Sequence, residues 1–348
     1  MFTGRFEGAT TMKSSVSAAV HARRRPRARR VLLGALALLL TGTVMTAGAA
    51  WWAVDHYTGR IGRIPGVFPT GVPQPASGKG GVTFLFAGLD ARSDLPTTGT
   101  DAQGPLWKEG MQRSDTMMLV HLPEDRSGAF AVSLPRDSWV DVPGHGNAKL
   151  NAAFSWGGPP LLIDTVQRLT GVRVDHFAVL DWSGFTKLTD ALGGADIPMA
   201  DGSKRHMSGE EALSYVRARK NLPRGDLDRT HRQQNYLRSV FSKLLSSGSV
   251  TDPFRWKKLL DAVTETVSVD DRLSDSDIRG LAWDLKGVKW AGMVFMNAPV
   301  TGTGMVSGQS VVHLDREAGQ GLWDAMAEDT MAQYVDSHTL DRLGDRTP

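Results

Sequence analysis

The stretch VTFLFAGLDARSD, residues 82–94, begins with an apolar run of strand length and ends in charged residues. Three more apolar runs of similar length follow it, at 116–122 (TMMLVHL), 129–134 (AFAVSL) and 176–180 (HFAVL). Continuous apolar runs of this length are typical of strands that are buried on both faces of a sheet. The four runs therefore predict a central sheet that is covered on both sides.

Helical patterns lie between and after these runs. Apolar periodicity predicts helices at 160–170, 182–191, 227–245, 254–267, 274–285 and 316–326. A capping box at Ser208–Glu211 opens a further helix that runs to about residue 219. Late strands are predicted at 293–297 and 310–314. Strands that alternate with helices indicate an α/β layered domain with a mixed central sheet.

The composition excludes several classes of site. None of the 348 residues is a cysteine, so a disulfide framework, a thiolate nucleophile and a cysteine-ligated metal are excluded. The net charge of +3 is uneven, because residues 1–30 carry +7 and the remainder sums to −4. The folded body therefore lacks the basic surplus that is typical of nucleic-acid-binding domains, and no nucleic-acid partner is expected.

An uncharged apolar segment of 24 residues, Val31–Val54, follows the basic block. At about 1.5 Å per residue it is long enough to cross a hydrocarbon core of roughly 30 Å. Trp51 and Trp52 lie at its far end, where aromatic rings favour the membrane interface. We therefore expect a single transmembrane helix with a cytoplasmic N-terminus and an extracytoplasmic body. A cleaved signal peptide, cut near Ala47-Gly48-Ala49, is the alternative.

These patterns divide the chain into five parts. The parts are a basic cytoplasmic tail (1–30), a transmembrane anchor (31–54), a Gly/Pro-rich linker (55–80), an extracytoplasmic domain (81–338) and a polar C-terminal tail (339–348). The linker is expected to act as a tether, and the polar tail is expected to fray.

Charged side chains gather at the ends of the predicted strands. Asp90 and Arg92 follow the first strand, Arg113 and Asp115 precede the second, and Arg136 follows the third. Open α/β folds place ligands at strand ends. Arginine offers a fork of donors that matches phosphate, and aspartate offers oxygens that suit Mg²⁺. The pattern indicates a phosphate held together with a metal, and the alternative is a set of solvated loop charges.

Two predicted helices add further polar groups. Arg229 and Gln233 begin the apolar stripe of the helix at 227–245, and Arg217 and Arg219 end the stripe of the preceding helix. A stripe that faces the core accepts arginine only where a polar cavity lies. The alternative is that the arginine stems reach past the helix ends into solvent. No P-loop, H-E-x-x-H or G-x-S-x-G motif occurs.

Ordered motifs between about 82 and 247 resemble the LytR-CpsA-Psr family of membrane-anchored cell-wall enzymes. The matching stretches are GLDARSD (88–94), RSDTMMLVHL (113–122), VSLPRDSWVDVPGHG (132–146), KLNAAFSWGGP (149–159), TGVRVDHFAVLDWSGFTKLTDALGG (170–194) and MSGEEALSYVRARKNLPRGDLDRTHRQQNYLRSV (207–240). The resemblance implies a three-layer α/β/α sandwich with a hydrophobic groove for a lipid tail. It also implies a phosphotransferase that moves a glycopolymer from a polyprenyl-pyrophosphate carrier onto peptidoglycan, forming a phosphodiester and releasing polyprenyl phosphate.

The resemblance also implies roles for individual residues. Arg136, Asp90 and Asp115 match catalytic positions, and the two aspartates match the Mg²⁺-associated acids. The positions that match pyrophosphate-binding residues are Arg92, Arg113, Lys149, Arg217, Arg219, Asp226, Arg229 and Gln233. The segment RARKNLPRGDLDR departs from the family pattern through extra charges at Lys220 and Arg224, which leaves the relative weight of Arg229 and Arg232 open.

Two other functions fit the same residues. A pyrophosphatase that uses water as acceptor would have the same site, and a non-catalytic, wall-polymer-binding regulator would need only the binding groups.

Overall fold

The computed structural model describes residues 56–90, 95–218, 222–245, 253–284 and 292–344. The predicted anchor at 31–54 and the predicted site residues Arg92 and Arg219 lie outside these ranges. Among the described residues, no helix combines the length and the apolar character that a membrane span requires.

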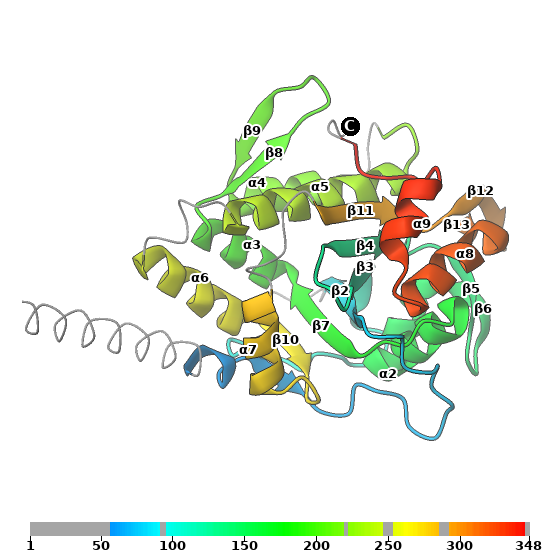
Figure 1. Cartoon of the computed structure of the whole chain (residues 1–348), viewed down its shortest axis with the longest axis horizontal. Helices are drawn as coiled ribbons and strands as arrows, with labels where there is room; N and C mark the ends of the chain where they lie inside the picture. The colour runs from blue at the N-terminus through cyan, green and yellow to red at the C-terminus, as the bar shows by residue number, and fades with distance from the viewer. Residues whose placement is uncertain (1–55, 91–94, 219–221, 246–252, 285–291, 345–348) are drawn as a thin grey trace, which may run out of the picture. The chain divides into compact units, whose positions relative to one another are not determined.

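A mixed sheet of seven strands forms the centre of the body (Figure 1). Its order is β1 (Gly62–Ile64), β10 (Val267–Asp270), β7 (His176–Asp181), β2 (Val82–Asp90), β3 (Arg113–Leu122), β4 (Ala129–Ser133) and β11 (Met293–Asn297). The pairs β1/β10, β7/β2 and β4/β11 are parallel, and the other pairs are antiparallel. The four apolar runs that predicted strands are the four adjacent strands β7, β2, β3 and β4, which confirms the mixed central sheet.

Helices cover both faces of the sheet because side chains alternate along each strand. Leu85 and Leu119 pack on one face with α2 (Leu150–Thr170), α8 (Arg316–Ala327) and α9 (Met331–Ser337). Phe86 and Met118 point to the other face, where α3 (Trp182–Ala191), α4 (Gly209–Arg217) and α5 (Asp226–Leu245) pack. Helices α6 (Pro253–Thr266) and α7 (Asp275–Asp284) flank β10 in the chain. The sandwich that the resemblance implied is therefore present.

Three short hairpins were not anticipated from the sequence. They pair β5 (Trp139–Val142) with β6 (Gly146–Lys149), β8 (Ala195–Pro198) with β9 (Lys204–Met207), and β12 (Val300–Val306) with β13 (Gln309–Leu314). The late strand predicted at 310–314 belongs to the last of them. Strands of four residues carry too little alternation to stand out from loops.

Helix α2 begins ten residues earlier than predicted, because a kink divides its apolar pattern. Gly158 has φ +62° at this kink, and Pro159 and Pro160 follow it. A Cβ atom at position 158 would lie 2.9 Å from the ring of Trp107. Both the backbone conformation and the packing therefore favour glycine at this position.

Part of the predicted tether at 55–80 belongs to the folded body. Gly62–Ile64 form β1 and pair with β10. Val67 and Phe68 are buried in the core, and the guanidinium carbon of Arg272 lies 4.0 Å from the centre of the Phe68 ring. The glycine and proline content of this segment predicted a tether. The ordered residues within it are held by partners that are distant in the sequence.

The described part of the polar tail is also ordered against the sheet. The Asn297 N–H donates to the Asp341 carbonyl at 3.0 Å, and the Leu343 N–H donates to the Phe295 carbonyl at 2.9 Å. The expectation of fraying fails for these residues because β11 supplies partners for their backbone groups.

Candidate active site

Asp115 and Arg136 meet because of the register between β3 and β4. Met118 pairs with Ser133 in the antiparallel ladder, and three positions further along Asp115 faces Arg136. The Arg136 Nη1 donates to the Asp115 Oδ1 at 2.5 Å, and each side chain is only 11% exposed. The predicted catalytic arginine is therefore held in place by a predicted metal-associated acid.

A β-bulge occurs at Asp115. Gly88 pairs with Thr116 and Leu89 pairs with Ser114, so Asp115 is the extra residue on β3. Bulges redirect a side chain relative to the regular pleat and are frequent beside active sites. Asp115 therefore has no paired residue on β2. Its carboxylate accepts a hydrogen bond from Arg136.

The backbone that carries Arg136 is fixed by two neighbouring elements. The Asn151 N–H, in the first turn of α2, donates to the Arg136 carbonyl at 3.0 Å. The Val312 N–H of β13 donates to the Asp137 carbonyl at 2.9 Å. These bonds hold the loop after β4 rigidly, which is the condition for presenting a side chain in one orientation.

Helix α5 brings two more predicted residues to this arginine. The Arg229 Nη2 lies 2.5 Å from the Asp226 Oδ1, one helical turn away, and the Arg136 Nε lies 3.9 Å from the same oxygen. The Arg229 side chain is only 3% exposed. Gln233 continues the same row of the helix and is buried. The polar start of this apolar stripe therefore meets buried acidic and basic partners, and the cavity that it indicated stays a prediction.

Asp137 and Lys149 complete the group. The Lys149 Nζ lies 3.1 Å from the Asp137 Oδ1, and the Arg136 Nε lies 3.7 Å from the Asp137 Oδ2. Asp137 was not predicted as a site residue, although its place next to Arg136 in the sequence was a signal. Lys149 was predicted, and its position directly before α2 places it here.

The electrostatic environment keeps Arg136 charged. Burial opposes the charged form, but Asp115, Asp137 and Asp226 outweigh it and raise the pKa of Arg136 above its ordinary value. The Nε of Arg136 is buried and forms no hydrogen bond with any described residue. A buried donor without a partner is rare in proteins. Its nearest acidic oxygens, on Asp137 and Asp226, lie 3.7 and 3.9 Å away, which is ion-pair distance and longer than a hydrogen bond.

The charges of this group already balance before any ligand binds. Arg136, Lys149 and Arg229 face Asp115, Asp137 and Asp226. A diphosphate diester brings about two negative charges, so its binding requires added positive charge or displacement of carboxylates.

Asp90 and Arg113 lie at the ends of their strands, and Arg113 is exposed. They oppose each other on β2 and β3, and Arg113 is two residues before Asp115. Within the described ranges, no three His, Asp or Glu side chains gather in a metal-binding arrangement. Mg²⁺ commonly uses one or two carboxylates and completes its shell with water and substrate phosphates. Asp90 and Asp115 stay the predicted carboxylates of such a partial set.

Two other predicted or disputed arginines have different surroundings. Arg217 is exposed, and its guanidinium carbon lies 5.5 Å from the centre of the Trp182 ring, so its recorded contact is with α3. The guanidinium carbon of Arg232 lies 5.1 Å from the centre of the Tyr215 ring. Of the two, Arg229 is the residue that pairs with Asp226 beside Arg136.

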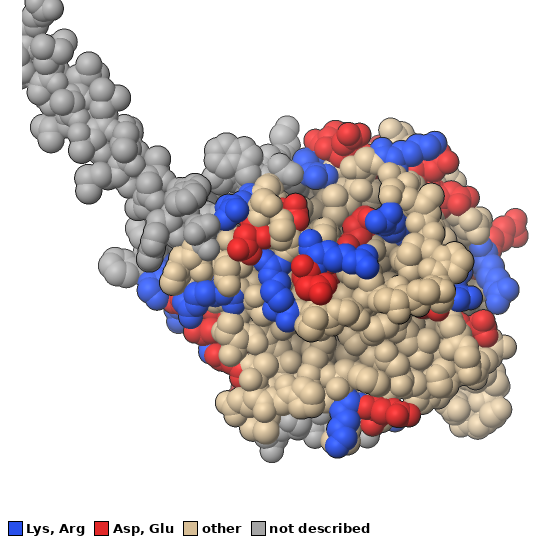
Figure 2. Space-filling model, turned by 90° about the horizontal axis from the view of Figure 1, so that it is seen from below, with Lys and Arg blue, Asp and Glu red and all other residues tan. Residues whose placement is uncertain are grey.

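Charges of both signs lie on the surface of the body. Figure 2 shows basic and acidic side chains side by side on one face. The expectation that nucleic acid is not a partner stays a prediction.

Comparisons with known proteins agree on a single family. A sequence profile described as the LytR_cpsA_psr family matches residues 69–328. The chain is 34% identical over 290 residues to the cell wall biosynthesis protein LcpA of Corynebacterium glutamicum, covering 70% of this chain and 55% of LcpA. It is 33% identical over 216 residues to the polyisoprenyl-teichoic acid–peptidoglycan teichoic acid transferase TagU of Enterococcus faecalis, covering 59% of this chain and 65% of TagU.

The fold has a counterpart among solved structures. The crystal structure of Bacillus subtilis TagV superposes with a TM-score of 0.58 at 21% identity, covering 72% of this chain and 98% of TagV. At this identity the likeness establishes the arrangement of helices and strands. The chain spans only a little over half the length of LcpA, so the two proteins are comparable over the shared region alone.

Proposed function

Because the chain belongs to the LytR-CpsA-Psr family, we propose that it transfers a glycopolymer from a polyprenyl-pyrophosphate carrier onto peptidoglycan. The names of its relatives support this proposal, since LcpA is a cell wall biosynthesis protein and TagU transfers teichoic acid to peptidoglycan. The product is a phosphodiester link, and polyprenyl phosphate is released.

The observation that carries the proposal is the environment of Arg136. Its guanidinium is buried, charged and fixed between Asp115 and Asp226, and its Nε–H forms no hydrogen bond with the described residues. A fixed cation in a water-poor site stabilises negative charge that develops during a reaction. Such an arrangement suits the oxygens of a diphosphate undergoing displacement.

The proposed reaction is a single displacement at phosphorus. A hydroxyl oxygen of peptidoglycan attacks the phosphorus that bears the glycan, and its proton passes to water. The bond from this phosphorus to the bridging oxygen breaks, and polyprenyl phosphate leaves with the electron pair. Arg136 and Arg229 stabilise charge on the phosphoryl oxygens, while Lys149, Arg113 and Gln233 bind the diphosphate. Arg92, Arg217 and Arg219 remain proposed contacts on the basis of the family resemblance.

The balanced charges of the site support a role for Mg²⁺. The ion would neutralise the roughly two charges of the diphosphate without displacing a carboxylate from its arginine. Asp90 and Asp115 would hold it, with phosphate oxygens and water completing the shell. Bound there, it would act as a Lewis acid on the phosphoryl oxygens.

We also propose that residues 31–54 anchor the protein as a single transmembrane helix, with the body outside the cytoplasm. This placement rests on the apolar segment and the basic block before it. Protease added to intact, wall-stripped cells should digest residues 81–338; resistance of the body would contradict the topology.

The decisive experiment follows the products with and without an acceptor. Purified protein is incubated with a lipid-linked glycopolymer, Mg²⁺ and peptidoglycan, and glycan bound to the wall is measured together with polyprenyl phosphate. We expect wall-bound glycan in wild type and none in Arg136→Ala. Free phosphorylated glycan as the sole product would indicate the pyrophosphatase instead. Unchanged wall-polymer content in cells carrying Arg136→Ala would indicate the non-catalytic regulator.

A further inference from the structure

Helix α5 uses two neighbouring rows of side chains for two different purposes. Asp226 and Arg229 form the row that faces Arg136. Thr230 and Gln234 form the next row, and both are buried. Because both rows belong to one helix, the contacts that fix the second row also fix the position of the first.

The second row is fixed to the strands on which the site is built. The Gln234 Nε2 donates to the Ser133 Oγ at 2.8 Å and to the Met296 carbonyl at 2.8 Å. Thr230 and Gln234 also donate to the Asn297 Oδ1, at 2.7 and 3.0 Å. Ser133 is the last residue of β4, three positions before Arg136. A displacement of α5 along its axis would break these bonds and move Asp226 away from Arg136.

The C-terminal segment completes this attachment through Asp341. The Asn297 Nδ2 donates to the Asp341 Oδ2 at 2.8 Å, so one asparagine side chain joins α5 to the tail. The Asp341 carbonyl also accepts the Asn297 N–H, as described above. Both the side chain and the backbone of Asp341 are therefore held by Asn297 of β11.

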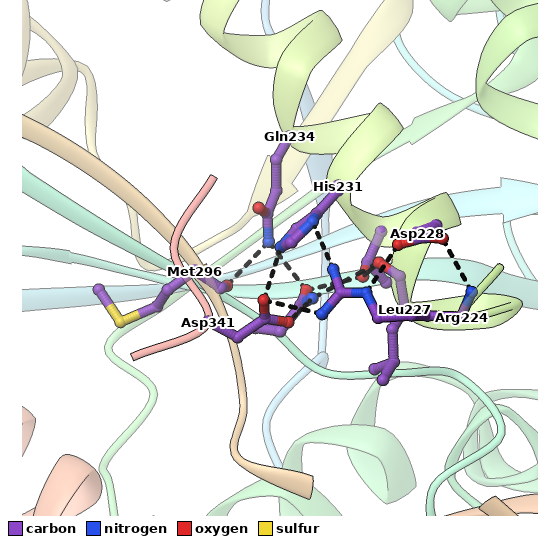
Figure 3. Close-up of polar contacts among 9 residues, drawn as sticks. Arg224, Leu227, Asp228, His231, Gln234, Met296 and Asp341 are labelled. Atoms are coloured by element: carbon purple, nitrogen blue, oxygen red, sulfur yellow. Dashed lines mark hydrogen bonds and ion pairs between the residues drawn. The ribbon is translucent and has the colours of Figure 1, made fainter. Parts of the chain in front are cut away.

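Arg224 joins Asp341 to the first turns of α5 (Figure 3). Its Nη1 donates to the Asp341 Oδ1 at 3.0 Å, its Nε to the Asp228 Oδ1 at 2.9 Å and its Nη2 to the His231 Nδ1 at 2.9 Å. The Arg224 N–H donates to the other Asp228 oxygen at 2.9 Å. Asp228 is buried, so its carboxylate requires these charge-assisted bonds.

Asp341 lies beyond the stretch of residues 69–328 that matches the family profile, and Arg224 lies within it.

We propose that Arg224 and Asp341 are positioning residues, which form a C-terminal clasp that sets α5, and hence Asp226 and Arg229, at the distance from Arg136 that the transferred diphosphate requires. The inference rests on the proposed function and adds that a residue of the C-terminal tail is needed to position the site. Neither residue is among the proposed contacts of the diphosphate; both act through the helix.

The test measures binding of farnesyl diphosphate, with Mg²⁺ present, and turnover with the lipid-linked glycopolymer. The variants are Arg224→Gln, Asp341→Asn and the double variant in the full chain. Each single variant should weaken binding about five- to tenfold, as expected for loss of a charge-assisted hydrogen bond. The double variant should bind no more weakly than either single variant, because the two residues act as a pair.

Two control variants separate positioning from general stability. Asp336→Asn changes an exposed carboxylate on α9, five residues before Asp341, and should bind as wild type does. Met331→Ala removes a buried side chain and lowers the melting temperature, and it should also keep wild-type affinity.

The outcomes are distinguishable from failure of the proposed function. Wild-type binding by Asp341→Asn, together with lost binding by Arg136→Ala, overturns the clasp and leaves the active site intact. If Met331→Ala and Asp341→Asn lose binding affinity equally, the effect of Asp341 is one of general stability, and the clasp is overturned. Wild-type binding by Arg136→Ala overturns the diphosphate site and the clasp with it.

Discussion

The guanidinium of Arg136 and the carboxylate of Asp115 are paired at 2.5 Å across the end of β3, and each side chain is about nine-tenths buried. The geometry depends on the planar fork of arginine, because the Nη1 binds Asp115 while the Nε is directed to the other carboxylates. Arg136→Lys should therefore fail to replace it. We expect turnover to fall about a hundredfold, as when one donor to a developing oxyanion is removed. Wild-type turnover in this variant would show that charge alone suffices.

Arg229 and Arg232 offer a matched comparison, since they lie one turn apart on α5. Arg229→Ala removes the partner of Asp226 and should reduce turnover about a hundredfold. Arg232→Ala removes a contact with the Tyr215 ring and should change turnover less than about twofold, at a stability cost of roughly 0.5–1 kcal/mol. Steady-state kinetics and thermal melting distinguish the two effects. Equal losses of turnover would contradict the assignment of Arg229 to the site.

Binding of Mg²⁺ should depend on the diphosphate. The described residues include no cluster of three acidic or histidine ligands, so the protein alone should bind the ion weakly. Titration calorimetry with Mg²⁺ should show an affinity at least about tenfold higher when farnesyl diphosphate is present. Asp115→Asn should abolish that increase, because one of the two proposed carboxylates is lost. Tight Mg²⁺ binding without the diphosphate would place the ion elsewhere.

The segment at 55–80 should stabilise the folded body in addition to linking it to the segment before it. Phe68 is 4% exposed and lies under Arg272. Phe68→Ala should lower the free energy of unfolding by roughly 3 kcal/mol, through lost burial and the cavity left behind. Denaturant titration of the protein measures this loss. Thr70→Ala, at an exposed position two residues later, is the control and should change stability by less than about 0.5 kcal/mol. An equally small change for Phe68→Ala would show that residues 55–80 act only as a tether and do not stabilise the fold.

Asp270 should make stability depend on acid pH. Burial acts to raise its pKa, but hydrogen bonds from His176 and from the Phe177 and Arg272 N–H groups prevail and lower the pKa below its ordinary value. The folded protein thus binds fewer protons than the unfolded chain at this group. The stabilisation is present above the unfolded pKa of about 4 and is lost as pH falls through the folded value.

Asp270→Asn should therefore remove part of the acid dependence. We expect a loss of roughly 1–3 kcal/mol at neutral pH, because an amide cannot accept all of these bonds. The difference from wild type should shrink as the pH falls below the unfolded pKa of about 4. Thermal melts from neutral pH down into this acid range measure both effects, and a constant difference across that range would exclude Asp270 as the titrating group.

The sequence predicted the parts of the fold whose pattern is local. The four adjacent strands β7, β2, β3 and β4 are largely apolar and most helices show a clear period, so these were found, whereas β10 and the first ten residues of α2 were not. β1 has three residues within a Gly/Pro-rich segment and exists only because β10 pairs with it. The tail residue Asp341 was expected to fray, because nothing near it in the sequence marks its partner Asn297, which is 44 residues away. Short elements that depend on remote partners leave no local pattern to read.

The site shows the same division. Asp115, Arg136, Asp226 and Arg229 were predicted from their positions and from the family resemblance, and the structure brings them together. The bulge at Asp115 and the strand register, which decide the actual pairing, cannot be counted from the sequence. Arg217 was predicted on the same grounds, yet its helix directs it to Trp182.

The backbone bonds between β11 and residues 341–343 have a consequence for solubility. An outermost strand with unused N–H and C=O groups is a template on which another molecule can add its own strand. The chain closes that template with its own last described residues. The edge of the sheet at β11 is thereby closed to strand addition by another copy of the chain.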